Sequence, residues 1–189
     1  MSAALMVIDM QNAYFESPAL QQHQERLVEK TNELIREAKA AGVPVLMVCT
    51  EHERDKSTWT LSMLDDDQGF IFSGSKQADF VPGLEWNDLP RLVKTRDSAF
   101  IGTDVLLRLR NWNVETLILA GVATHNCVAQ TAADAFANNF RVRFAREALA
   151  STDSEYEETI LRMLSDEYRQ PVQSSAELKD FLRSCSSQG

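Results

Sequence analysis

The sequence predicts an α/β protein with an open, mostly parallel sheet and helices on both faces. Short, continuous apolar runs recur along the chain, and such runs are typical of strands buried on both faces. Segments with apolar residues at helical spacing alternate with these runs. The 189 residues are 44% hydrophobic and 25% charged, as in an ordinary globular protein. The alternation favours right-handed crossovers and a single three-layer domain that covers residues 1–189.

The first quarter of the chain follows this alternation closely. ALMVI at 4–8 predicts a buried strand, residues 21–41 predict an amphipathic helix, and VLMVC at 45–49 predicts a second strand. The pair Ala41-Gly42, with Pro44 after it, is a helix stop signal. Residues 50–89 interrupt the pattern with aromatic residues among Gly and Pro. So long a connection either carries a binding function or is a surface loop with its own packing cluster.

The second half of the chain returns to alternation. Predicted strands cover residues 90–94, 115–120, 140–144 and 171–173, and predicted helices cover 103–111, 126–138, 154–167 and 176–183. Asp153 or Ser154 is expected to cap the helix at 154–167. The tail SCSSQG is expected to fray, because chain ends are rarely held by packing.

Charge and cysteine content exclude several classes of protein. The net charge of −9 argues against nucleic-acid and anionic-membrane partners, because phosphate groups need a basic surface. The three cysteines, Cys49, Cys127 and Cys185, form no CxxC pair, so neither a disulfide framework nor a zinc site is supported. A reducing cytosol fits this pattern best. We find no signal peptide and no apolar run of the ~20 residues that cross a bilayer.

Residues 116–136, TLILAGVATHNCVAQTAADAF, predict a strand, a tight turn and a helix, with Cys127 at or near the start of the helix. A helix N-terminus favours negative charge, so a thiol there loses its proton more easily and becomes nucleophilic. Backbone N–H groups at that position can also stabilise an oxyanion. The alternative is a buried cysteine that only fills space.

Three chemically useful side chains follow the ends of predicted strands. Asp9, Lys94 and Cys127 would therefore share the carboxyl edge of the sheet, where α/β proteins bind ligands. An ammonium near a thiol favours the thiolate, and a carboxylate can take up the thiol proton and pass it on. Alternatively, Asp9 caps a local turn and Lys94 is a solvated strand end.

Other motifs offer less. The sequence has no GxGxxG, P-loop or GxSxG motif after a strand. His125 lies two residues before Cys127, a spacing that does not bring side chains together on a helix, so it is expected to shape the turn or the pocket rim. The segment 51–55 is acidic but contains only one histidine, His52, and is better explained as a solvated loop than as a metal site.

Three segments together resemble the isochorismatase-like cysteine hydrolase superfamily. They are VIDMQNAYFE at 7–16, VKTRDSAFIGTDVLLRL at 93–109 and LAGVATHNCVAQTAADAFANNFRV at 119–142. The resemblance implies a three-layer, Rossmann-like α/β/α sandwich. It also implies an Asp-Lys-Cys triad at Asp9, Lys94 and Cys127, and a non-proline cis peptide at Val122–Ala123. The N–H groups of Ala123 and Cys127 would then form the oxyanion hole.

One departure from this family concerns metal binding. Nicotinamidases of the family carry an Asp-x-His-x3-His metal motif after the second strand, and TEHERDKSTW at 50–59 lacks it. We therefore expect no metal and no cofactor, and nicotinamidase activity is not favoured. The leading hypothesis is a metal-independent cysteine hydrolase that cleaves a C–N bond of a small amide or ureide through a thioester. The alternatives are vinyl-ether hydrolysis of an isochorismate-like acid by Asp9 acid catalysis, and a binding protein without turnover.

Substrate contacts and assembly are the remaining expectations. The candidates for substrate binding are Gln11, Phe15, Trp59, Phe100 and His125, with Tyr14 and Phe72 as further pocket walls; each aromatic residue could equally belong to the core. Relatives of the resembled family are commonly dimers or tetramers. Aromatic residues in 50–89 would suit an interface, so we expect a cytoplasmic homo-oligomer acting on a small molecule.

Overall fold

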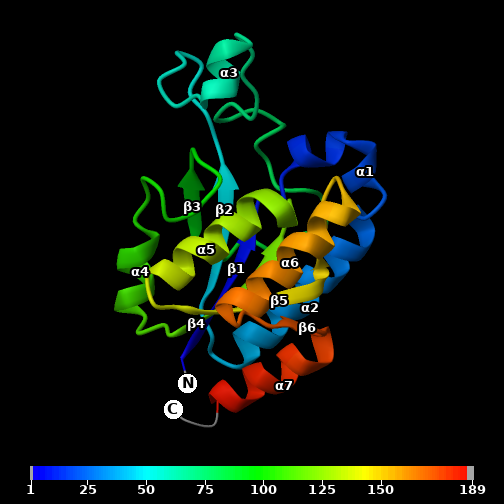
Figure 1. Cartoon of the computed structure of the whole chain (residues 1–189), viewed down its shortest axis with the longest axis vertical. Helices are drawn as coiled ribbons and strands as arrows, with labels where there is room; N and C mark the ends of the chain where they lie inside the picture. Colours follow the sequence, from blue (N-terminus) through cyan, green and yellow to red (C-terminus); the bar gives the residue numbers. More distant parts are fainter. Residues whose placement is uncertain (1, 187–189) are drawn as a thin grey trace.

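The computed structural model describes residues 2–186 and has the predicted three-layer architecture (Figure 1). Within these residues one sheet of six strands has the order β3-β2-β1-β4-β5-β6, and every pairing is parallel. The strands are β1 (Ala3–Ile8), β2 (Val45–Thr50), β3 (Arg91–Lys94), β4 (Thr116–Gly121), β5 (Arg141–Leu149) and β6 (Val172–Gln173). The order reverses direction beside β1, which places a ligand crevice near the carboxyl ends of β1 and β4.

Helices cover both faces of this sheet (Figure 1). One face packs against α1 (Pro18–Gln21), α2 (Gln24–Ala40) and α7 (Ser175–Ser186), and the other against α4 (Val105–Asn111), α5 (Ala129–Ala137) and α6 (Ser154–Tyr168). The central strands supply both cores at once. In β1, Leu5 and Val7 face one core while Met6 and Ile8 face the other, which explains the continuous apolar run.

Two helix signals in the sequence are confirmed. Helix α2 buries the stripe predicted by its periodicity, and Gly42 follows it with a positive φ of 69°. Asp153 caps α6: its carboxylate accepts hydrogen bonds from the N–H groups of Glu155 at 2.9 Å and Tyr156 at 3.0 Å. These bonds satisfy two of the donors that a helix start leaves unpaired.

Three predicted elements differ from the structure. Strand β5 extends to Leu149, beyond the predicted end at residue 144, because its second half continues to pair with β4 at Gly121. The central helix does not start at residue 126; a π-helical turn, η2 (Thr124–Val128), precedes α5. Helix α7 continues to Ser186, because Leu178 and Leu182 anchor it in the core. The fraying expected from residue 184 is thus wrong as far as Ser186, and its remainder lies outside the described residues.

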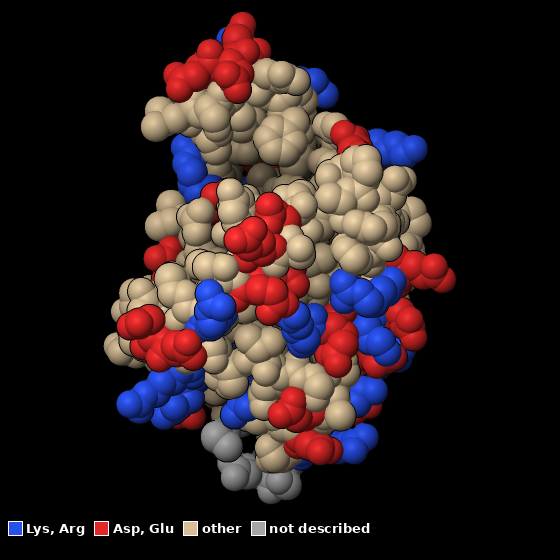
Figure 2. Space-filling model, turned by 45° about the vertical axis from the view of Figure 1, so that its right-hand side comes forward, with Lys and Arg blue, Asp and Glu red and all other residues tan. Residues whose placement is uncertain are grey.

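Residues 50–89 form a segment that projects from the carboxyl edge of the sheet and contains the short helix α3 (Leu61–Asp65) (Figure 1). Trp59 and Phe80 are buried, and Phe80 packs against Trp86 with ring centroids 4.9 Å apart. Phe70, by contrast, is 43% exposed. Phe80 and Trp86 join the core that α2 and α7 cover, while Trp59 pairs with Phe72 inside the segment. The segment is therefore not a loop packed only on itself, and Phe70 is its only aromatic residue that is exposed. Figure 2 shows the surface hollowed beneath this projection.

No helix among residues 2–186 combines the length and the apolar character needed to cross a bilayer.

Candidate active site

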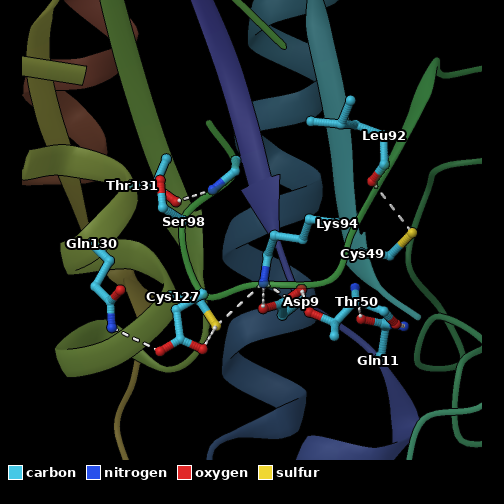
Figure 3. A network of polar contacts seen from close by, with 12 residues as sticks. Asp9, Gln11, Cys49, Thr50, Leu92, Lys94, Ser98, Cys127, Gln130 and Thr131 are labelled. Carbon is cyan, nitrogen blue, oxygen red and sulfur yellow. Dashed lines mark hydrogen bonds and ion pairs between the residues drawn. The ribbon is translucent and has the colours of Figure 1, made fainter. Parts of the chain in front are cut away.

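Asp9, Lys94 and Cys127 meet at the carboxyl edge of the sheet, as the strand ends predicted (Figure 3). Asp9 directly follows β1, Lys94 is the last residue of β3, and Cys127 lies in η2 after β4. The side chains of Asp9 and Lys94 are completely buried, and Cys127 is 5% exposed. Burying charged groups is costly unless they are paired, so their pairing matters for folding as well as for chemistry.

The Lys94 ammonium has a partner for each of its three N–H donors. It lies 2.8 Å from Asp9 Oδ2, and it donates to Thr50 Oγ1 at 2.7 Å and to Cys127 Sγ at 3.4 Å. Thr50 Oγ1 in turn donates to Asp9 Oδ1 at 3.0 Å. Both carboxylate oxygens of Asp9 are therefore held, and the lysine links the carboxylate to the thiol.

Gln11 supports this network through hydrogen bonds to the backbone of Thr50 and Ala78. Its side-chain amide accepts from the Thr50 N–H at 2.8 Å and donates to the carbonyls of Thr50 at 2.8 Å and Ala78 at 2.9 Å. These bonds tie β2 to the projecting segment beside Asp9. Gln11 is fully buried, so its observed role is to fix the position of Thr50.

The backbone around the site is tightly constrained. Asp9 has a φ of 55°, a left-handed conformation that is uncommon for a residue other than glycine and is often found at functional sites. Gly121 has a φ of 116°, and a Cβ atom added there would lie 1.9 Å from the Ile8 carbonyl oxygen. Only glycine allows β4 to approach β1 so closely beside Asp9. The Val122–Ala123 peptide is cis, as the family resemblance implies.

Burial and the neighbouring charges shift the pKa values of Cys127 and Lys94. Burial raises the pKa of the Cys127 thiol well above 9.0, the charge of Asp9 raises it further, and Lys94 opposes both effects. For Lys94, burial lowers the pKa, but the charges of Asp9 and Cys127 outweigh burial and the net shift is upward. The lysine is therefore held in its charged form, while burial and Asp9 oppose the thiolate that the sequence predicts and Lys94 favours it.

A cavity of about 320 Å³ opens above Cys127. Its walls include Tyr14, Phe70, Asp97, Ala123 and Asn126. No backbone hydrogen bond from the Ala123 N–H is found within residues 2–186, so this donor is available beside the thiol. Burial raises the pKa of the Tyr14 phenol, with further contributions from Asp9 and Cys127, so its hydroxyl is a neutral donor. The cavity can therefore hold a small molecule with its carbonyl near Cys127.

The residues predicted to bind substrate lie elsewhere. Phe15 is in the core, Trp59 is buried and donates to the Glu53 carbonyl at 2.9 Å, and Phe100 packs against Phe140. His125 contacts the Ser151 hydroxyl at 2.9 Å and the Tyr156 ring, which agrees with a role in shaping the turn. Neither these four residues nor Gln11 lines the cavity above Cys127. Tyr14, a further pocket candidate, does line it.

Sequence reasoning missed Thr50 and Asp97. Thr50 ends β2, so the strand-end argument that selected Asp9 and Lys94 would have found it too. Asp97 lies three residues beyond Lys94, and its Oδ1 is 3.9 Å from Cys127 Sγ. No pattern in the sequence marks Asp97, because the turn after β3 decides where its side chain points.

The segment after β2 does not fit the metal motif of the nicotinamidases. It offers one imidazole, that of His52, whose Nδ1 lies 3.0 Å from the Thr58 carbonyl oxygen. Burial lowers the pKa of this histidine. Within residues 2–186, no three His, Cys, Asp or Glu side chains are grouped so that they could hold a metal ion.

Fold and site together define an α/β protein with a buried carboxylate–ammonium–thiol network at a sheet edge. The sequence model of the Isochorismatase domain matches residues 3–177. A plant protein from Arabidopsis thaliana, described as a probable inactive nicotinamidase, is 34% identical over 147 residues, which cover 74% of this chain and 75% of that protein. The chain therefore belongs to the isochorismatase-like hydrolase family.

Two further relatives extend the comparison. The N-carbamoylsarcosine amidase of Arthrobacter sp. is 28% identical over 163 residues, covering 77% of this chain and 58% of the amidase. The crystal structure of an isochorismatase family protein from Desulfovibrio vulgaris is 32% identical, with a TM-score of 0.85, and the match covers 96% of this chain and 98% of that chain. The family and its fold thus extend over nearly the whole chain.

Proposed function

We propose that this protein is a cysteine hydrolase that cleaves a C–N bond of a small amide or ureide. The observation that carries the proposal is Lys94, whose ammonium contacts both the carboxylate of Asp9 and the thiol of Cys127 inside the protein. Such an arrangement gives a nucleophile, a group that can move its proton, and a cation that holds both in place.

The first half of the reaction forms a thioester. Asp9 takes the proton of Cys127 as Sγ attacks the substrate carbonyl carbon, and a C–S bond forms. The N–H groups of Ala123 and Cys127 stabilise the negative oxygen of the tetrahedral intermediate. Asp9 then gives the proton to the leaving nitrogen, the C–N bond breaks, and the amine or ammonia departs.

The second half returns the enzyme to its starting state. Asp9 removes a proton from water, whose oxygen attacks the thioester carbon. The intermediate collapses, the C–S bond breaks, and the proton returns to the sulfur as the acid or carbamate leaves. Lys94 stays charged throughout, so it stabilises the carboxylate and the transient thiolate and keeps both side chains aligned.

The relatives described above bear on this proposal. One relative is an amidase that acts on N-carbamoylsarcosine, a ureide. Another is described as a probable inactive nicotinamidase, and this chain lacks the metal motif of the nicotinamidases. We further propose a reducing, cytoplasmic location, because the described residues contain three cysteines, all of them free.

A panel of small amides and ureides with ammonia detection tests the function. We expect turnover of at least one member by the wild type and its loss in Cys127→Ser, a variant that keeps the shape of the site but has a weak nucleophile. Mass spectrometry of the stopped reaction should show an acyl adduct on Cys127. Full turnover by Cys127→Ser, with no adduct on the wild type, would exclude the thioester.

The alternative is vinyl-ether hydrolysis of an isochorismate-like acid. It requires Asp9 as an acid and can proceed without the thiol. Cys127→Ala separates the two reactions: retained turnover of the ether supports the alternative, and abolished turnover of an amide supports the thioester. Failure of both reactions across the panel would favour a binding protein.

A further inference from the structure

Asp97 stands at the junction of two adjoining cavities. Together with Tyr14 and Phe70 it lines both the cavity of about 320 Å³ above Cys127 and a neighbouring one of about 270 Å³ under the projecting segment. A substrate that occupies the cavity above Cys127 therefore lies beside this side chain.

The Asp97 carboxylate is held in a defined orientation. Gln130 on α5 donates to its Oδ2 at 2.7 Å, while Oδ1 lies 3.9 Å from Cys127 Sγ. One oxygen is thus fixed from the helix, and the other is turned toward the nucleophile. A group attached next to the scissile carbonyl would lie within reach of this second oxygen.

No cation neutralises this carboxylate among the described residues. Lys94 is engaged by Asp9, and the Arg96 guanidinium donates to the carbonyls of Thr58 at 2.8 Å and Thr95 at 2.6 Å. A negative charge beside a nucleophilic sulfur opposes formation of the thiolate. The enzyme therefore keeps a carboxylate without a cationic partner beside the thiol, where its charge adds to the effects of burial and Asp9.

We propose that Asp97 is a specificity-determining residue that selects substrates with a protonated amine or several N–H donors next to the scissile carbonyl, and rejects substrates with a carboxylate there. This inference rests on the proposed hydrolase function and names its substrate class. A bound cation would also cancel the charge that hinders the thiol, so the preferred substrate would promote its own attack. At a separation of a few ångströms in a partly hydrated site, one charge changes relative rates by about tenfold.

The decisive experiment measures the reactivity of Cys127 with charged thiol reagents and needs no turnover. The probes are methanethiosulfonates with a trimethylammonioethyl or a sulfonatoethyl tail, and modification is followed on the Cys127 peptide by mass spectrometry. We expect the cation-to-anion rate ratio to fall about tenfold in Asp97→Asn. The matched control is Asp88→Asn, which removes the same charge from an exposed position before β3, at the opposite end of the sheet. Its ratio should equal that of the wild type.

An equal ratio in Asp97→Asn and the wild type would overturn the inference, as would an equal fall in both variants. Hydrolysis of glycinamide, propionamide and malonamate gives the second readout, at a pH where the glycinamide amine is protonated. The wild type should prefer them in that order in kcat/KM, and Asp97→Asn should lose the preference. If no amide is hydrolysed while the reagent ratio still falls, the proposed function fails but the charge selection by Asp97 stands.

Discussion

The ammonium of Lys94 lies 2.8 Å from the carboxylate of Asp9, and neither side chain has any exposed surface. Removing one partner of such a buried pair typically costs about 3–5 kcal/mol, because the other charge is left without compensation. The pair thus matters for the stability of the fold, and it also has a second role. Its contact with Cys127 connects it to the chemistry of the site.

The first prediction concerns the pH dependence of thiol alkylation. Burial and Asp9 raise the pKa of Cys127, and Lys94 lowers it. Removing the Asp9 charge should lower the midpoint, and removing the Lys94 charge should raise it. Reaction with iodoacetamide across a pH series should give midpoints in the order Asp9→Asn, wild type, Lys94→Met. A midpoint for Lys94→Met at or below that of the wild type would contradict the assignment.

A second prediction concerns the Thr50 hydroxyl. Thr50→Val keeps the shape of the side chain but removes the acceptor for Lys94 and the donor to Asp9. A buried ammonium with one unsatisfied N–H should reduce the free energy of unfolding by about 1–3 kcal/mol, as measured by urea denaturation. Turnover should fall as well, because Asp9 is held less firmly. Thr50→Ser is the control: it keeps the hydroxyl, and a loss as large as that of Thr50→Val would indicate a packing effect.

Gly121 provides a third prediction, on folding. In Gly121→Ala the new Cβ would meet the Ile8 carbonyl oxygen, a backbone atom that no rotamer change can move, and the φ is positive. We expect a loss of more than about 4 kcal/mol or failure to fold, measured as soluble yield and thermal unfolding. Gly74→Ala is the matched control, since Gly74 also has a positive φ but nothing lies within 4 Å of the added atom. Similar losses in both variants would show that the positive φ, and not the clash with Ile8, causes the loss of stability.

The fourth prediction is that the protein forms a homo-oligomer, a dimer or tetramer in which the projecting segment packs against a second copy. Leu61 on α3 is 80% exposed, and Leu64 and Phe70 nearby are 46% and 43% exposed. Sedimentation at micromolar concentration should show a mass above that of the monomer, and Leu61→Glu should reduce it. Leu107→Glu on α4 is the control, because Leu107 is 62% exposed outside the projecting segment. A wild-type species of monomer mass with full activity would refute assembly.

Much of the fold could be predicted from local patterns. Apolar runs such as ALMVI at 4–8 can be satisfied only where both faces of a strand are covered, and the alternation with helical periodicity then requires a parallel sheet. Because parallel strands all end at one edge, the positions of Asp9 and Lys94 after such runs were enough to place them together. Boundaries were less certain: η2 and the long β5 depend on contacts across the sheet rather than on local propensity.

By itself, the sequence determined the layers, the order of the elements and the meeting of Asp9, Lys94 and Cys127 at one edge of the sheet. Only the tertiary structure revealed that burial and Asp9 oppose ionisation of the thiol, while Lys94 favours it. It also decided that Trp59 and Phe15 are buried away from the cavity, while Tyr14 and Asp97 line it. An aromatic or acidic residue in a loop has the same local sequence pattern whether it lines the cavity or lies buried away from it. Its direction is set by distant segments that pack around it, and those segments meet only in the folded chain.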